Sequence, residues 1–113
     1  MAIRRTADSV PLDRLCELRN PDEIARLVPP GSKNRVLLER GLELARSHFP
    51  EALLAVVAER DIEEPDYETV VLIIGVHCDW RIASDRFDKM YEDGWLDIFT
   101  ESKMLIFAVL EFS

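Results

Sequence analysis

The stretch Thr69-Val-Val-Leu-Ile-Ile-Gly-Val-His-Cys78 decides how the rest of the chain is interpreted. It is almost continuously apolar and rich in β-branched residues, and it lacks the period-2 alternation of a strand with one face in water. A strand that is covered on both faces has no need to alternate. We therefore interpret it as the central strand of a small sheet that the remaining elements cover.

Two further apolar stretches lie on either side of this strand in the sequence. Residues 52–60 precede it across the acidic segment 61–68, and residues 103–112 follow it at the end of the chain. The short linker predicts that the first two strands pair as an antiparallel hairpin. If the second and third strands are parallel, their connection is expected to be a right-handed crossover.

Helical patterns fill most of the remaining sequence. Short helices are expected over 11–18 and 20–28, and longer ones over 32–49, beginning at the cap Ser32, and over 79–94, beginning at the cap Asp79. Residues 95–99 are expected to form an apolar turn. The pattern predicts a single α+β domain over 1–113, with a lead-in containing short helices at 1–31 and an α-β-β-α-β core at 32–113.

The predicted strands carry more apolar surface than two long amphipathic helices can cover. An exposed apolar face of several hundred Å² is uncommon on a monomeric protein. The sequence therefore predicts a three-stranded sheet with helices packed on it that is completed by dimerisation or by an obligate partner.

The net charge of −8 is concentrated in the second half of the chain. Residues 1–60 carry ten Lys and Arg against nine Asp and Glu, whereas residues 61–113 carry four against thirteen. Such an acidic half disfavours binding to a phosphate backbone and favours a basic protein partner. Acidic residues also keep small domains soluble, which is the simpler explanation of the same charge.

The cysteines and the apolar runs indicate the compartment. Cys16 and Cys78 lie far apart in the sequence, which favours reduced thiols and a cytoplasmic protein. We expect no signal peptide and no membrane span, because no apolar run approaches the ~18 residues that a span requires.

Candidates for catalysis are few. His77 and Cys78 are neighbours, but adjacent strand residues point to opposite faces, so they are not expected to act as a pair. Asp85, Asp88 and Glu92 follow at helical spacing and are expected to form a solvated face. No zinc, calcium or nucleotide motif occurs, and we expect neither a metal nor a cofactor.

Large aromatic residues near acidic ones are the best candidates for partner binding. Trp80 either begins the apolar stripe of its helix or lies in an interface, and Trp95 either fills the end of the sheet or contacts a partner. The predicted partner-binding set consists of Trp95, Phe99, Asp85, Asp88, Glu92, Asp93 and Asp97.

From about residue 44 onward, the chain resembles a group of small bacterial proteins without an established activity. The motifs that carry the resemblance are Ala45-Arg46-Ser47-His48-Phe49-Pro50, Arg86-Phe87-Asp88, Trp95-Leu96-Asp97 and the closing Glu111-Phe112. The resemblance implies an α+β fold and no enzymatic function.

The sequence alone does not specify a biological role, and it leaves three hypotheses. The first is a non-enzymatic acidic module that binds a basic protein, as antitoxins, immunity proteins or adaptors do. The second is a small enzyme with an acid-base site of Asp85, Asp88 or His77 in a cleft between two subunits, which requires at least two of these residues to meet in one pocket. The third is a structural subunit of a constitutive complex.

Overall fold

The computed structural model describes residues 12–64 and 66–112. A four-stranded mixed sheet and several helices make an α+β fold, as predicted. The lead-in expected before residue 12 lies outside the described residues. The elements in chain order are η1 (Leu12–Arg14), β1 (Glu17–Leu18), α2 (Pro21–Leu27), α3 (Lys33–His48), β2 (Leu53–Arg60), β3 (Glu68–Val76), α4 (Trp80–Met90), η2 (Tyr91–Trp95), α5 (Leu96–Glu101) and β4 (Ile106–Phe112).

The sheet has the strand order β1-β2-β3-β4. Strands β2 and β3 form the predicted antiparallel hairpin, with Leu53 opposite Gly75 and Arg60 opposite Glu68. Strand β4 pairs in parallel with β3, so the connection through α4 and α5 is a crossover between parallel strands. The apolar stretch at 69–78 is therefore an inner strand of the sheet.

The prediction of three strands is wrong, because residues 17–18 form a fourth strand parallel to β2. The chain there was expected to be helical, yet helix η1 is only three residues long. Beyond β1, the Arg19 N–H donates to the Val56 carbonyl at 3.0 Å. The Asn20 side-chain amide both donates to and accepts from the Ala58 backbone at 2.8 Å. Two residues are too few for a periodic pattern to reveal such a strand.

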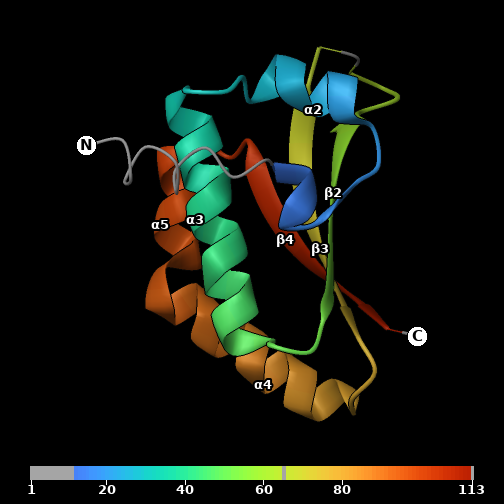
Figure 1. Ribbon diagram of the computed structural model, residues 1–113, viewed down its shortest axis with the longest axis vertical. Helices are drawn as coiled ribbons and strands as arrows, with labels where there is room; N and C mark the ends of the chain where they lie inside the picture. Colours follow the sequence, from blue (N-terminus) through green and yellow to red (C-terminus); the bar gives the residue numbers. More distant parts are fainter. Residues whose placement is uncertain (1–11, 65, 113) are drawn as a thin grey trace.

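The described helices cover one face of the sheet (Figure 1). Alternate residues of β2, β3 and β4 point toward them, and the core lies between the two layers. The fully buried side chains of this core include Ile24, Leu37, Leu38, Phe49, Val56, Leu72, Ile74, Met90, Trp95, Ile98 and Ile106. No described helix is long and apolar enough to cross a lipid bilayer.

Local polar contacts fix where α3 begins and where it meets β2. The Ser32 hydroxyl accepts the Arg35 N–H at 3.2 Å and caps the helix, as its position in the sequence predicted. After the helix ends, the Arg46 guanidinium donates to the carbonyls of Pro50 and Ala52 at 3.2 and 2.7 Å. Arg46 therefore holds the tight connection that positions β2 under α3.

The expected apolar turn at 95–99 is helical in the structure. Helix α4 continues into η2, which is kinked at Gly94, and α5 begins directly afterwards. Gly94 has φ of 149°, a conformation that side chains with a Cβ rarely adopt. The kink redirects the chain, so that Trp95 is buried in the core against α3.

Candidate functional site

The structure does not expose the predicted aromatic anchor. Trp95 is fully buried, and the closest atoms to a Cβ built on Gly41 belong to its ring. Phe99 is half-buried and packs edge-to-face on Phe107, with 5.1 Å between the ring centroids. Trp95 therefore fills the core, and its side chain is not accessible to a partner in this conformation.

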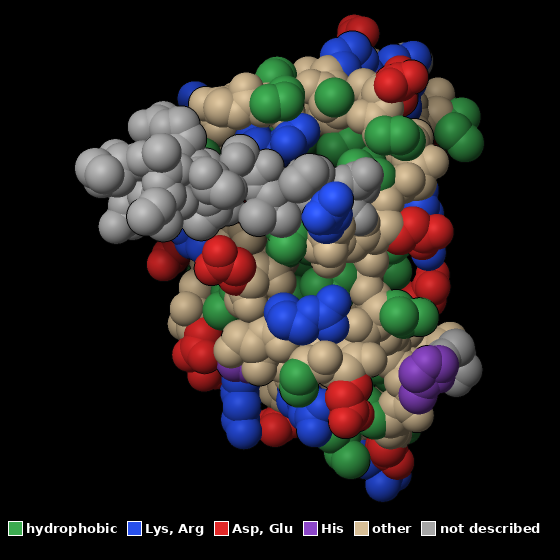
Figure 2. Space-filling model, viewed as in Figure 1, with side chains coloured by type: hydrophobic (Ala, Val, Ile, Leu, Met, Phe, Trp, Pro, Cys, Tyr) green, Lys and Arg blue, Asp and Glu red, His purple; other side chains and the backbone are tan. Residues whose placement is uncertain are grey.

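The predicted acidic residues are on the surface but do not surround an exposed Trp95. Asp93 contacts His48 at 2.8 Å, which ties the kink in η2 to the end of α3. Asp85 contacts Lys89 at 3.3 Å along the same helix. Asp88, Glu92 and Asp97 are exposed. In the view of Figure 2, acidic and basic side chains are interspersed, with no large patch of a single sign.

Trp80 is the exposed tryptophan among the described residues, with 61% of its surface accessible. The Arg81 guanidinium carbon lies 5.5 Å from the centroid of its ring, within the range of a cation–π contact. Trp80 therefore lies outside the buried part of α4, which is formed by Ala83 and Met90.

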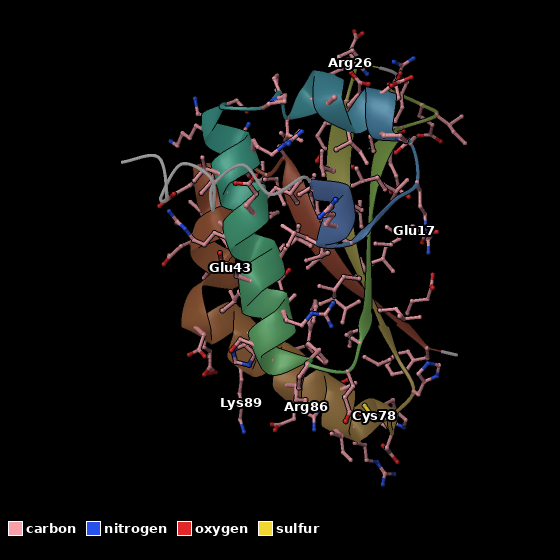
Figure 3. The ribbon with its side chains drawn as sticks, in the orientation of Figure 1. Glu17, Arg26, Glu43, Cys78, Arg86 and Lys89 are labelled. Carbon is pink, nitrogen blue, oxygen red and sulfur yellow. The ribbon has the colours of Figure 1, made fainter. Side chains whose placement is uncertain are left out.

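The enzyme hypothesis requires His77 to meet Asp85 or Asp88 in one pocket. His77 lines a cavity of about 230 Å³ at the end of β3, together with Phe49, Glu51, Ala52, Gly75, Val76, Cys78 and Arg86. Neither Asp85 nor Asp88 lines this cavity. Figure 3 shows Cys78 and Arg86 at the same end of the molecule. A single chain therefore does not bring His77 together with either aspartate in this cavity, and a site in a cleft between two subunits stays a prediction.

The described residues also contain no group of three or more His, Cys, Asp and Glu side chains that could hold a metal ion.

The most distinctive surface is the side of the sheet that no described helix covers. We call it the open face and define it as Leu53, Ala55, Val57, Val71, Ile73, Phe107 and Val109. These residues alternate with the core residues along β2, β3 and β4, so they point to the opposite side. In Figure 1 this side of the sheet carries no helix.

The open face has a packed centre and exposed margins. Ala55, Val71 and Ile73 shield one another and form a small apolar cluster, with Val57 and Phe107 packed against it. By contrast, 74% of Leu53 and 42% of Val109 are exposed. A hollow of about 370 Å³ on this face is lined by Glu59, Tyr67, Thr69, Val71, Ile73, Phe107 and Val109.

Charged residues border the open face. Glu17 lies beside Ala55, and Glu111 lies beside Gly75, so both carboxylates are on the same side as the open face. Arg19 reaches both of them, at 3.5 Å to Glu17 and 3.8 Å to Glu111. The side chain of Glu59 makes no hydrogen bond or ion pair with the described residues. Figure 3 shows Glu17 on the side of the sheet away from α3. We call Glu17, Glu59, Glu111 and Arg19 the rim of the open face. The three carboxylates and one guanidinium give the rim a net negative charge.

A second charged cluster joins α2 to the far end of the hairpin. Arg26 makes a two-pronged contact with Glu68, binds Glu23 at 2.7 Å, and shares Glu68 with Arg60 at 3.2 Å. The Arg26 guanidinium lowers the pKa of Glu68, and Arg60 adds to the effect. The same contacts raise the pKa of Arg26. Each charge has its counterion, so the cluster holds α2 on the sheet.

The sequence predicted that apolar strand surface would remain uncovered, but not which residues form it. The signal was the lack of alternation in residues 69–76 and 106–110, which places apolar side chains on both faces. It did not reveal the acidic rim, because Glu17, Glu59 and Glu111 come from three separate strands that only the sheet brings together.

No protein-family model, curated protein or solved structure matches this chain.

Proposed function

We propose that this chain is a non-enzymatic protein-binding module whose open face receives a basic protein partner. The observation that carries the proposal is an apolar sheet face that no described element covers, bordered by carboxylates. An antitoxin, an immunity protein or an adaptor would be a concrete form of this function. The proposed location is the cytoplasm. Co-transcription of the gene with one that encodes a basic, toxin-like protein would favour the first of these forms.

The apolar part of the open face supports binding by burial. Covering exposed apolar surface contributes about 25 cal/mol per Å², so Leu53 and Val109 would gain most from a partner. Ala55, Val71 and Ile73 are already packed, which gives the face a rigid centre. A surface that is ordered before binding loses little conformational entropy when the partner arrives.

The rim supports a basic partner by charge. Arg19 already neutralises part of Glu17 and Glu111, whereas Glu59 has no described counterion. Glu59 also lines the hollow of the open face, so a Lys or Arg of the partner could contact it beside the apolar centre. The net charge of −8 would further steer a basic protein toward the chain at low ionic strength.

Charge reversal at two matched sites tests this proposal. Glu59→Lys changes the rim, and Asp88→Lys changes an exposed carboxylate on α4 that also has no described ion pair. We expect Glu59→Lys to weaken binding of the basic protein partner about tenfold and to reduce the salt dependence of that binding. Asp88→Lys should have little effect on either. A loss of binding with Asp88→Lys alone would move the site to α4 and overturn the proposal.

We also propose that the protein is a homodimer in solution. Two uncovered features favour self-association, namely the open face and the unpaired outer edge of β4. Sedimentation equilibrium should then give twice the 13.0 kDa mass of one chain at micromolar concentration. A mass of one chain at every concentration tested would contradict the dimer, without bearing on the basic partner.

A further inference from the structure

Strand β4 ends the sheet, and apart from the Ile106 N–H the backbone groups along its outer edge have no partner among the described residues. The Val70 N–H donates to the Leu105 carbonyl at 2.8 Å, which fixes the phase of the parallel ladder. In such a ladder, every second residue of the outer strand hydrogen-bonds to the neighbouring strand through its backbone N–H and C=O. The backbone groups of the residues between them point away from that strand. Ala108, Leu110 and Phe112 are among those that point away. Ile106 points away too, and its N–H is bound by the Ser102 hydroxyl at 3.1 Å.

The two edges of the sheet are treated differently. At the β2 edge, β1 is two residues long, and the Asn20 amide then occupies both backbone groups of Ala58. Natural proteins block an exposed edge in this way, or with proline, lysine or a bulge. Strand β4 reads Ile-Phe-Ala-Val-Leu-Glu-Phe over 106–112, with no proline or lysine, and Glu111 near its end is its one charged side chain. Within residues 12–64 and 66–112, no strand pairs with this edge.

We infer that two copies of this chain pair through β4, antiparallel about a two-fold axis at Val109, and join their sheets into one. The inference rests on the homodimer proposed above and adds where and in which register the two copies meet. The joined sheets bring the two open faces side by side, because Phe107 and Val109 belong both to β4 and to the open face. The partner-binding surface is then continuous across the dimer.

The phase of the ladder restricts the register. Only the even-numbered residues of β4 direct their backbone N–H and C=O groups outward. Hydrogen-bonded pairs between two copies therefore form only where an even-numbered residue lies opposite another even-numbered residue. An axis at Val109 pairs Ala108 with the partner's Leu110 and Ile106 with the partner's Phe112, which uses all of β4. An axis at Ala108 leaves Phe112 without a strand partner, and two of its three hydrogen-bonded pairs use Ile106, whose N–H is already bound by Ser102.

The charge of Glu111 separates the two remaining registers. With the axis at Val109, the two copies of Glu111 are four residues apart along the strands, about 13 Å at ~3.3 Å per residue. That distance exceeds the screening length of ~8 Å at physiological salt. With the axis at Leu110, the two carboxylates come within about 7 Å along the strands and repel each other. The Val109 register therefore extends over all of β4 and keeps the two copies of Glu111 further apart than the Leu110 register does.

A cysteine at the axis tests both the edge and the register. In a directly opposed, non-hydrogen-bonded antiparallel pair, the Cα atoms are about 4.5 Å apart, within the range for a disulfide. In a Cys16→Ser, Cys78→Ser background, Val109→Cys should form a covalent dimer under mild oxidation. The matched variant Glu111→Cys, two residues along the same strand, should not. The opposite pattern would overturn the Val109 register.

A proline on the same strand tests the edge without a cysteine. Leu110→Pro removes an N–H that points away from β3, and proline is tolerated at such edge positions. We expect this variant to sediment as one chain where the wild type sediments as two, and Leu110→Val, which keeps the N–H, to remain dimeric. Circular dichroism checks that both variants are folded.

The outcomes separate this inference from the homodimer on which it rests. A dimer that persists in Leu110→Pro and gives no disulfide with Val109→Cys would overturn edge pairing and point to contact between the two open faces. A wild-type chain that is monomeric throughout would overturn both the homodimer and the edge pairing. If the β4 edge pairs with a strand of another protein instead of a second copy, the chain alone will be monomeric. That result overturns the homodimer and the edge pairing in the same way.

Discussion

Gly41 of α3 lies directly against the indole ring of Trp95. A Cβ built on Gly41 would be 2.5 Å from Trp95 Cζ3 and 2.9 Å from Cη2, closer than real Cβ contacts allow. The absence of a side chain at residue 41 therefore lets α3 approach the kinked segment between α4 and α5.

Gly41→Ala should destabilise the fold through this contact. Overpacking of a core costs about 1–3 kcal/mol, and the rigid ring of Trp95 leaves little room for relaxation. Urea denaturation measures the loss. In a double-mutant cycle with Trp95→Phe, whose smaller ring relieves the clash, the alanine should cost much less. Equal costs in both backgrounds would show that Gly41 does not act through Trp95.

Lys103→Gly should stabilise the protein. Lys103 and Met104 have φ of 57° and 64° in the turn before β4, a conformation that side chains disfavour. Relief of this strain, less the greater freedom of glycine in the unfolded chain, should give a net gain of about 0.5–1 kcal/mol. Thermal unfolding measures it. Glu101→Gly, in the regular helix α5, is the control and should lower the melting temperature.

Asn20→Asp should weaken the edge of β2. The aspartate keeps the shape but loses the donor to the Ala58 carbonyl and brings an oxygen against it. We expect a loss of about 1–2 kcal/mol in the free energy of unfolding, together with faster hydrogen exchange at the Ala58 amide. Asn34→Asp, on α3, changes the charge equally and should have little effect on either measurement.

Stability should fall in acid partly through Glu68. Arg26 holds the pKa of Glu68 below its ordinary value near 4.5, so the ionised carboxylate favours the folded state. This contribution is fully present above pH 4.5 and is lost as the pH falls through the lowered pKa of the folded state. Unfolding measured against pH should therefore show a smaller acid loss in Glu68→Gln. Glu63→Gln, whose side chain has no described ion pair, should follow the wild type.

The sequence was sufficient to predict the long helices and strands, and to predict more apolar strand surface than the long helices cover. Residues 69–76 and 106–112 are apolar without alternation, and the structure shows them as adjacent parallel strands with apolar side chains on both faces. Ser32 and Asp79 marked the starts of two helices because a cap is a local feature.

Other features depended on contacts that no local pattern contains. β1 consists of two residues that gain their partners from β2, more than thirty residues away. The helix predicted to end at Gly94 is α4 only as far as Met90, and the chain kinks at Gly94, with φ of 149°, and continues into α5 instead of a turn. The sequence leaves two places for Trp95, the end of the sheet or a partner interface, and the space that Gly41 leaves free admits its ring to the core.

Photo-crosslinking in cells tests the open face most directly. A photoreactive phenylalanine analogue placed at Leu53, on the open face, is compared with the same analogue at Leu96 and Val36, which are also exposed, at 56% and 50%, but lie on α5 and α3. Our account predicts that Leu53 captures a discrete basic protein and that Leu96 and Val36 do not. Adducts formed at Leu96 or Val36 and absent at Leu53 would contradict it.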